Sequence, residues 1–176
     1  MKVLVLTGSP HKKGTTNVLA EAFCTGVVEA GGEAVRIDAA LQEINPCRGC
    51  DYCKSRGVCV QKDDMQEVSR QVLEADAIAL ISPIYFFGMT AQIKAVIDRL
   101  YATYPAFQQK GLHAALICAG GDTEEWVMQG AVANYEALCR YLNWQDRGRV
   151  FALGAQTKED LKQTYIDAAQ SLGRNM

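Results

Sequence analysis

The sequence predicts an α/β protein with a doubly wound, five-stranded parallel sheet and helices on both faces. Three observations support this fold class. Strand-like and helix-like segments alternate along the whole chain. Three strand-like segments are apolar throughout, as expected of central parallel strands, while another alternates apolar and polar residues like an edge strand. This pattern matches the strand order 2-1-3-4-5, in which ligands bind beyond the carboxyl ends of the strands.

The five expected strands are short. They cover residues 3–6, 34–38, 77–81, 114–118 and 150–153. The first, third and fourth are apolar at every position and are expected at the centre of the sheet. In the second, Val35 and Ile37 alternate with Arg36 and Asp38, so that strand is expected at the edge.

Apolar stripes at helical spacing predict the helices that connect and follow these strands. Asp64 and Glu67 have the spacing of a capping box and predict the start of a helix just after them. Thr157 is expected to cap the last helix. Its inward-facing residues are expected to be Leu161, Tyr165, Ala168 and Leu172.

The bulk composition indicates a globular protein with one domain over residues 1–176 and a cysteine-rich insertion loop at about 45–62. Hydrophobic residues make up 49% of the chain. The net charge of −2 gives no broad basic surface for nucleic acid or an anionic membrane. No apolar run approaches the roughly 20 residues of a membrane span, and no secretory signal is visible, so a cytoplasmic location is expected.

The loop after the first strand has the composition of a phosphate site. It leads into a helix, whose amino end offers free N–H groups and a positive dipole. The candidate binding residues are Ser9, His11, Lys13, Gly14, Thr15, Thr16 and Asn17. The loop is neither a Walker A sequence nor a Gly-x-Gly-x-x-Gly fingerprint, and it lacks the acidic residues of a receiver domain. The alternative is a polar turn with a threonine cap.

Two further loops follow the third and fourth strands. The first carries consecutive aromatic residues suited to a planar, conjugated ligand, and its candidates are Pro83, Ile84, Tyr85, Phe86, Phe87 and Gly88. The alternative is a buried loop or a subunit interface. The second, Ala119, Gly120 and Gly121, allows a close approach of the backbone to a ligand, or is a plain turn.

Four of the seven cysteines form one cluster, Cys47-x2-Cys50-x2-Cys53-x5-Cys59. Four closely spaced thiols suit an iron–sulfur cluster. Zinc more often binds paired Cys-x2-Cys units set well apart, and a metal-free, redox-labile segment is the third interpretation. The isolated Cys24, Cys118 and Cys139 are expected to be structural.

Several motifs together resemble one known family. They are Gly8-Ser9-Pro10, the cysteine cluster, Asp63-Asp64-Met65, Ser82-Pro83-Ile84-Tyr85 and Lys94-x3-Asp98-Arg99. This combination resembles the flavodoxin-like NADPH-dependent FMN reductase superfamily, and within it most of all the iron–sulfur flavoproteins. The family often has arginine where His11 stands, and Lys12 or Lys13 are the candidates to replace that charge.

The resemblance implies FMN as cofactor. The first loop would bind its phosphate, residues 83–88 would line the isoalloxazine ring, and residues 119–121 would close the far side. The four clustered cysteines would ligate a 4Fe–4S cluster that exchanges electrons with the flavin. It also implies a homodimer or homotetramer, NAD(P)H as a candidate electron donor, and a small molecule or ferredoxin-like protein as redox partner.

The predicted function is therefore an FMN-dependent oxidoreductase or electron-transfer flavoprotein of the iron–sulfur type. One alternative is a cluster-free NAD(P)H-dependent FMN or quinone reductase, and another is a non-enzymatic, flavodoxin-like electron carrier. No catalytic side chain is expected, because the cofactor carries the chemistry.

Overall fold

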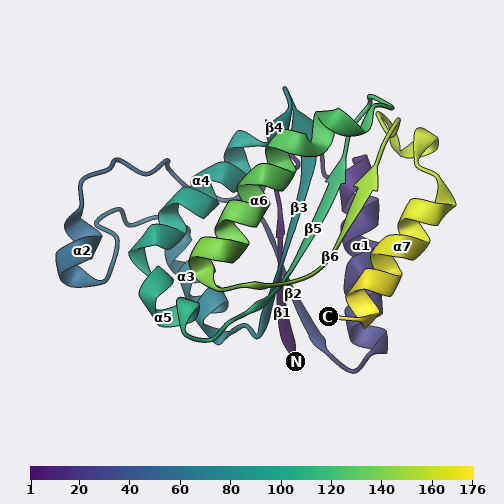
Figure 1. Cartoon of the computed structure of the whole chain (residues 1–176). Coiled ribbons are helices and arrows are strands. Elements are labelled where there is room, and N and C mark those ends of the chain that lie inside the picture. Colours follow the sequence, from purple (N-terminus) through teal and green to yellow (C-terminus); the bar gives the residue numbers. More distant parts are fainter.

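The computed structural model describes residues 1–176 and has a central sheet of five parallel strands (Figure 1). The strands lie in the order β2-β1-β3-β5-β6. Their bounds are Lys2–Thr7, Glu33–Asp38, Ala77–Tyr85, His113–Ala119 and Gln145–Ala152 for β1, β2, β3, β5 and β6. The five strands expected from the sequence take these places in this order, so the predicted doubly wound sheet is confirmed.

Helices cover both faces of the sheet (Figure 1). On one face, α1 (Thr15–Glu29) packs against α7 (Gln163–Arg174). The other face carries α3 (Met65–Glu74), α4 (Ala91–Arg99), α5 (Tyr104–Gln108) and α6 (Gln129–Leu142). Short 3₁₀ turns cover Ala39–Leu41, Leu100–Ala102, Glu125–Met128 and Lys158–Asp160. No helix combines the length and the apolar character that a bilayer crossing requires.

The central strand β1 shows why its sequence is apolar at every position. Leu4 and Leu6 belong to the buried cluster under α3, α4 and α6, while Val3 and Val5 belong to the cluster under α1 and α7. Side chains alternate across a strand, so a strand covered on both faces needs apolar residues throughout. The edge strand β2 has no fully buried residue, in agreement with its alternating pattern.

The pair α1 and α7 approaches closely at a glycine. A Cβ atom placed on Gly26 would overlap the carbonyl oxygen of Gln170 on α7. Only a residue without a side chain allows the two backbones to come this near. This contact fixes the carboxyl-terminal half of α1 against the carboxyl-terminal half of α7.

The segment after Ile81 differs from the loop predicted there. β3 continues to Tyr85 and pairs antiparallel with β4 (Gly88–Met89), with Tyr85 opposite Gly88. The turn residues Phe86 and Phe87 have φ values of 47° and 69°. Two-residue hairpin turns favour glycine and asparagine at such positions, and the Phe-Phe sequence carries no such signal.

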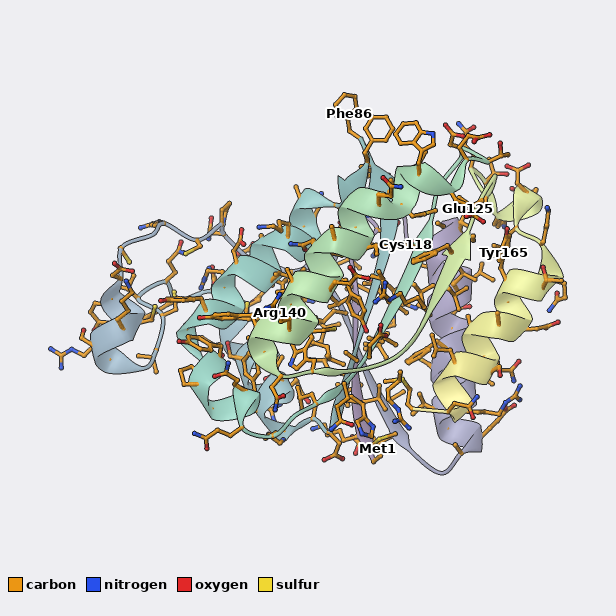
Figure 2. The ribbon with its side chains drawn as sticks, in the orientation of Figure 1. Met1, Phe86, Cys118, Glu125, Arg140 and Tyr165 are labelled. Carbon is orange, nitrogen blue, oxygen red and sulfur yellow. The ribbon has the colours of Figure 1, made fainter.

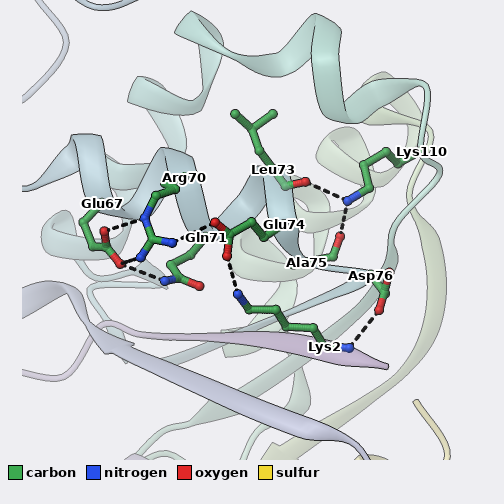
Figure 3. Close-up of polar contacts among 9 residues, drawn as sticks. All are labelled: Lys2, Glu67, Arg70, Gln71, Leu73, Glu74, Ala75, Asp76 and Lys110. Atoms are coloured by element: carbon green, nitrogen blue, oxygen red, sulfur yellow. Dashed lines mark hydrogen bonds and ion pairs between the residues drawn. The ribbon is translucent and has the colours of Figure 1, made fainter.

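The predicted capping box at the start of α3 does not form. Asp64 accepts a hydrogen bond from the backbone N–H of Glu43 at 2.7 Å. Glu67 instead binds Arg70 at 2.6 Å and accepts from the Gln71 amide at 2.8 Å (Figure 3). Long-range contact with the preceding segment and an ion pair within the helix take the two side chains away from the helix end.

The last helix also begins later than predicted. Thr157 and Asp160 form a capping box around the 3₁₀ turn Lys158–Asp160, and α7 starts only at Gln163. Leu161 and Leu172 are buried as predicted and Tyr165 is half-buried, whereas Ala169 is buried in place of the predicted Ala168, which is exposed. The turn between β6 and α7 is thereby left free to contribute to the carboxyl edge of the sheet.

Candidate functional site

A pocket of about 830 Å³ lies at the carboxyl ends of β1, β3, β5 and β6. Four loops line it: Ser9, His11, Lys12, Lys13, Gly14, Thr15 and Thr16; Pro83, Ile84 and Tyr85; Ala119, Gly120 and Gly121; and Ala155, Gln156, Thr157, Lys158 and Glu159. The structure therefore brings the three loops singled out in the sequence into one cavity. Its size is within the range of small-molecule and cofactor sites.

The loop of residues 9–16 is folded by its own hydrogen bonds. The His11 carbonyl oxygen accepts from the Gly14 N–H at 3.1 Å, and the His11 N–H donates to Ser9 Oγ at 3.2 Å. α1 begins at Thr15, and no side chain caps its amino end at Gly14. The first N–H groups of a helix have no partner within the helix, so this end of the pocket offers donors for an anion.

The hydroxyl of Thr16 is the most specific indication of a ligand. Thr16 is 1% exposed and lines the pocket. Its Oγ1 is buried without a hydrogen-bond partner. Because a buried polar group without a partner costs free energy, a phosphate oxygen in the pocket would satisfy it.

Asn17 does not line this pocket. Its Nδ2 donates to the His11 carbonyl oxygen at 2.6 Å, and its Oδ1 accepts from Arg36 at 2.6 Å. Asn17 instead lines a smaller neighbouring cavity with Arg36 and Asp38. Both ends of its amide are used to hold the loop in shape, a role that the sequence did not indicate.

The aromatic loop is divided by the hairpin. Pro83, Ile84 and Tyr85 line the pocket, whereas Phe86, Phe87 and Gly88 lie outside it. Phe86 is 96% exposed and projects from the hairpin tip (Figure 2). The ring of Phe87 stacks on Trp126 with centroids 5.1 Å apart.

The loop after β6 is a part of the site that the sequence analysis missed. Backbone hydrogen bonds join it to the loop after β5: Ala155 N–H to Gly120 O at 2.9 Å, and Gly154 N–H to Asp122 O at 2.7 Å. Residues 155–159 follow the carboxyl end of the fifth strand, so the rule that pointed to the other loops also applies to this one.

The pocket carries more positive than negative charge. Three lysines, Lys12, Lys13 and Lys158, line it, against the single carboxylate of Glu159. The chain as a whole has a net charge of −2. A locally cationic pocket on a mildly acidic protein favours an anionic ligand.

The cysteine segment projects from the side of the molecule, beyond α3 and α4 (Figure 1). It contains the short helix α2 (Tyr52–Arg56). Cys47 and Cys50 are exposed, Cys53 and Cys59 are half-buried, and none forms a disulfide. No three His, Cys, Asp or Glu side chains in the structure converge on a metal-sized site. The four thiols fit a thiophilic metal group in donor type, but binding would have to bring their sulfur atoms together.

A buried ion pair holds this segment to the body of the protein. Arg99, at the end of α4, binds Asp63 through Nη1 and Nη2 at 2.8 and 2.9 Å. The two side chains are 1% and 6% exposed. The Arg99 guanidinium lowers the pKa of Asp63 to about 2. The Asp-Asp-Met motif and the α4 motif of the sequence thus meet in one contact.

Among the isolated cysteines, Cys118 is buried, and Cys24 and Cys139 are half-buried. Cys118 lies within β5 and is fully buried (Figure 2). Burial raises the pKa of its thiol to about 12. Burial also raises the pKa of Cys24 and of Cys139. None of these thiols lines the pocket.

Comparison with known proteins agrees with this architecture. An iron-sulfur flavoprotein of Archaeoglobus fulgidus is 38% identical over 128 residues, which are 71% of this chain and 58% of that protein. An iron-sulfur flavoprotein of Methanocaldococcus jannaschii is 38% identical over 120 residues, 68% of this chain and 62% of that protein. The matches thus span about three fifths of the length of these relatives.

Among solved structures, an NAD(P)H:quinone oxidoreductase from Methanothermobacter marburgensis superposes with a TM-score of 0.75 at 20% identity, covering 99% of this chain and 96% of that one. This likeness supports the doubly wound fold. A family profile also matches residues 1–158, which include the cysteine segment and every residue that lines the pocket except Glu159. The chain belongs to the NADPH-dependent FMN reductase family.

Proposed function

We propose that this chain is an FMN-dependent oxidoreductase that binds FMN in the 830 Å³ pocket. Membership of the NADPH-dependent FMN reductase family supports the cofactor and the redox chemistry. The observation that carries the proposal is the unpartnered, buried hydroxyl of Thr16, at the start of α1 and at the cationic end of the pocket. A phosphate group is the ligand that this combination favours.

The chain's own residues divide into two groups around the cofactor. Ser9, His11, Lys12, Lys13, Gly14, Thr15 and Thr16 would hold the phosphate, with Asn17 bracing their loop. Pro83, Ile84 and Tyr85 would contact the ring on one side, and Ala119, Gly120 and Gly121 on the other. FMN supplies hydride and single-electron transfer when bound. The protein binds and orients it and needs no acid–base side chain.

NAD(P)H is the proposed electron donor, and a small acceptor such as a quinone or a free flavin is the proposed oxidant. The family description supports the nicotinamide donor. No separate nicotinamide motif is present in the sequence. A cytoplasmic location and assembly as a homodimer or homotetramer remain predictions from the sequence.

A second role is proposed for the cysteine segment, as a site for an iron–sulfur cluster that exchanges electrons with the flavin or with a ferredoxin-like protein. Four unpaired thiols within residues 47–59 support it, as does the similarity to iron-sulfur flavoproteins. Zinc and a metal-free segment are the alternatives. Iron, sulfide and zinc assays on anaerobically purified protein distinguish the three, with about four iron and four sulfide per chain for a cubane cluster.

A flavin titration tests the main proposal. FMN and riboflavin, which lacks the phosphate, are added separately to cofactor-free protein, and flavin fluorescence is followed. We expect FMN to bind at least tenfold more tightly than riboflavin, because charge-assisted hydrogen bonds to the phosphate are worth about 1.5–3 kcal/mol. Failure of both flavins to bind would remove the proposal. Anaerobic bleaching of bound FMN by NADPH or NADH then tests the donor.

A further inference from the structure

Arg99 joins the two ends of the cysteine segment. Its Nη1 donates to the carbonyl oxygen of Asn45 at 2.8 Å, and Nη1 and Nη2 bind the Asp63 carboxylate at 2.8 and 2.9 Å. Asn45 precedes the first clustered cysteine and Asp63 follows the last. The guanidinium is almost fully buried at the end of α4. One side chain therefore closes the base of the whole loop.

The third nitrogen of this guanidinium is not used by the clamp. Nε is buried and has no hydrogen-bond partner in the structure. Arg99 and Cys59 line the same cavity of about 340 Å³. Arg99 thus has a spare, buried N–H donor and shares a cavity with Cys59, although no hydrogen bond joins the two side chains in this structure.

The other clustered cysteines do not line the cavity that holds Arg99 and Cys59. Cys47 and Cys50 are exposed, and the Gly49 N–H at 3.5 Å from Cys47 Sγ is a weak local contact. The four thiols are therefore not equivalent before anything binds.

We propose that Arg99 is the positioning residue of the cysteine site: its Nη atoms clamp the loop, and its Nε, unpaired in this structure, donates to the Cys59 sulfur and orients it when a thiophilic metal binds. Cys47, Cys50 and Cys53 then close onto Cys59. Hydrogen bonds from outer groups to metal ligands orient them, and losing such a partner typically costs about 10–100-fold in metal affinity. The inference rests on the metal-binding part of the proposed function and does not depend on FMN.

Cobalt(II) titration of the reduced full-length protein, under anaerobic conditions, is the test. Thiolate-to-cobalt absorption reports sulfur ligation directly. The variants are Arg99→Gln, Arg99→Lys, Cys59→Ser and the double variant Arg99→Gln/Cys59→Ser. Lys94→Gln is the matched control, because Lys94 lies on the same helix in an exposed ion pair with Asp98. Circular dichroism and urea unfolding check that each variant folds, and FMN binding is measured on the same samples.

We expect Arg99→Gln to weaken cobalt binding by about 10–100-fold and to lower the charge-transfer absorption per bound cobalt. Arg99→Lys keeps the charge, so it is expected to lose less cobalt affinity than Arg99→Gln. The control Lys94→Gln is expected to bind cobalt as tightly as the wild-type protein. In the Cys59→Ser background, Arg99→Gln should have little further effect. If Arg99→Gln does not fold, Arg99→Lys gives the same comparison when it is measured in the wild-type chain and in the Cys59→Ser variant.

Equal weakening by Arg99→Gln with and without Cys59 would overturn the proposal, because Arg99 would then act only as a clamp. Absence of cobalt binding to the wild-type chain would overturn it together with the proposed metal site, while intact FMN binding would leave the flavin function standing. A third outcome is that Arg99→Gln weakens cobalt binding only when Cys59 is present, while the protein fails to bind FMN. This result would support the positioning role and remove the flavin proposal.

Discussion

The hydroxyl of Thr90 donates a hydrogen bond to the carbonyl oxygen of Gly8 at 2.8 Å, and both groups are buried. The backbone N–H of Thr90 also donates to Ser82 Oγ at 3.0 Å. Thr90 precedes α4, Gly8 begins the loop of residues 9–16, and Ser82 begins the part of β3 that enters the hairpin. One threonine therefore fixes two walls of the proposed flavin pocket relative to each other.

Thr90→Val should lower the free energy of unfolding by about 1–3 kcal/mol, because it leaves the Gly8 carbonyl buried without its partner. FMN affinity should fall as well, since the two loops lose their fixed spacing. Urea unfolding and FMN titration measure the two effects. The control is Thr25→Val, whose hydroxyl makes an exposed bond to Glu21 O at 2.9 Å. Equal effects of the two substitutions would contradict the linking role of Thr90.

Thr16→Val should separate cofactor binding from stability. In the cofactor-free protein it removes an unpartnered buried hydroxyl, so stability should be unchanged or higher. FMN should bind about tenfold more weakly, because the phosphate loses a donor, while riboflavin binding should not change. Paired titrations with the two flavins check this. A matching loss of riboflavin affinity would show that Thr16 does not face the phosphate.

The Asp63–Arg99 pair predicts a stability loss in acid. The pKa of Asp63 falls from an ordinary 3.8 to about 2 on folding. Its contribution is therefore complete above 3.8 and is lost as the pH falls through about 2. A shift of this size corresponds to about 2 kcal/mol.

Asp63→Asn should remove this part of the pH dependence in urea unfolding across the acid range. It should also destabilise the protein near neutral pH by several kcal/mol, since Arg99 would remain buried without its counter-charge, typically about 3–5 kcal/mol. Asp98→Asn, in an exposed ion pair with Lys94, is the control and should change little. A wild-type profile that matches the Asp63→Asn profile would contradict the buried pair.

The hairpin predicts different roles for neighbouring aromatic residues. Tyr85 lines the pocket, whereas Phe86 is 96% exposed at the tip. Tyr85→Ala should weaken FMN binding by several-fold to about tenfold, from the loss of aromatic contact. Phe86→Ala should leave FMN affinity unchanged in the same titration. If Phe86→Ala weakened FMN binding as much as Tyr85→Ala, the isoalloxazine ring of FMN would lie at the tip of the hairpin and not in the pocket.

Much of the fold and part of the site could be predicted from the sequence, because the signals are local. Apolar residues at every position of β1 reflect burial on both faces, and this pattern, with the alternation in β2, predicted the strand order. Strand ends are also local, so the fold rule picked out the loops that begin at Ser9, Pro83 and Ala119. The loop after β6 obeys the same rule, but its residues have no distinctive composition.

Other features depended on partners far apart in the chain or on backbone conformation. The positive φ angles of Phe86 and Phe87 turned a predicted loop into a hairpin and placed both rings outside the pocket. Long-range contacts also redirected Asp64 from its expected capping role.

The sequence by itself determined the sheet, the carboxyl-edge location of the site and the presence of four clustered thiols, since periodicity and spacing are properties of neighbouring residues. Only the tertiary structure decided which side chains enter the pocket, that Asn17 braces its loop, and that Arg99 pairs with Asp63 beside Cys59. These contacts join residues that are far apart in the sequence and become neighbours only when the strands and helices pack. No local sequence pattern predicts them.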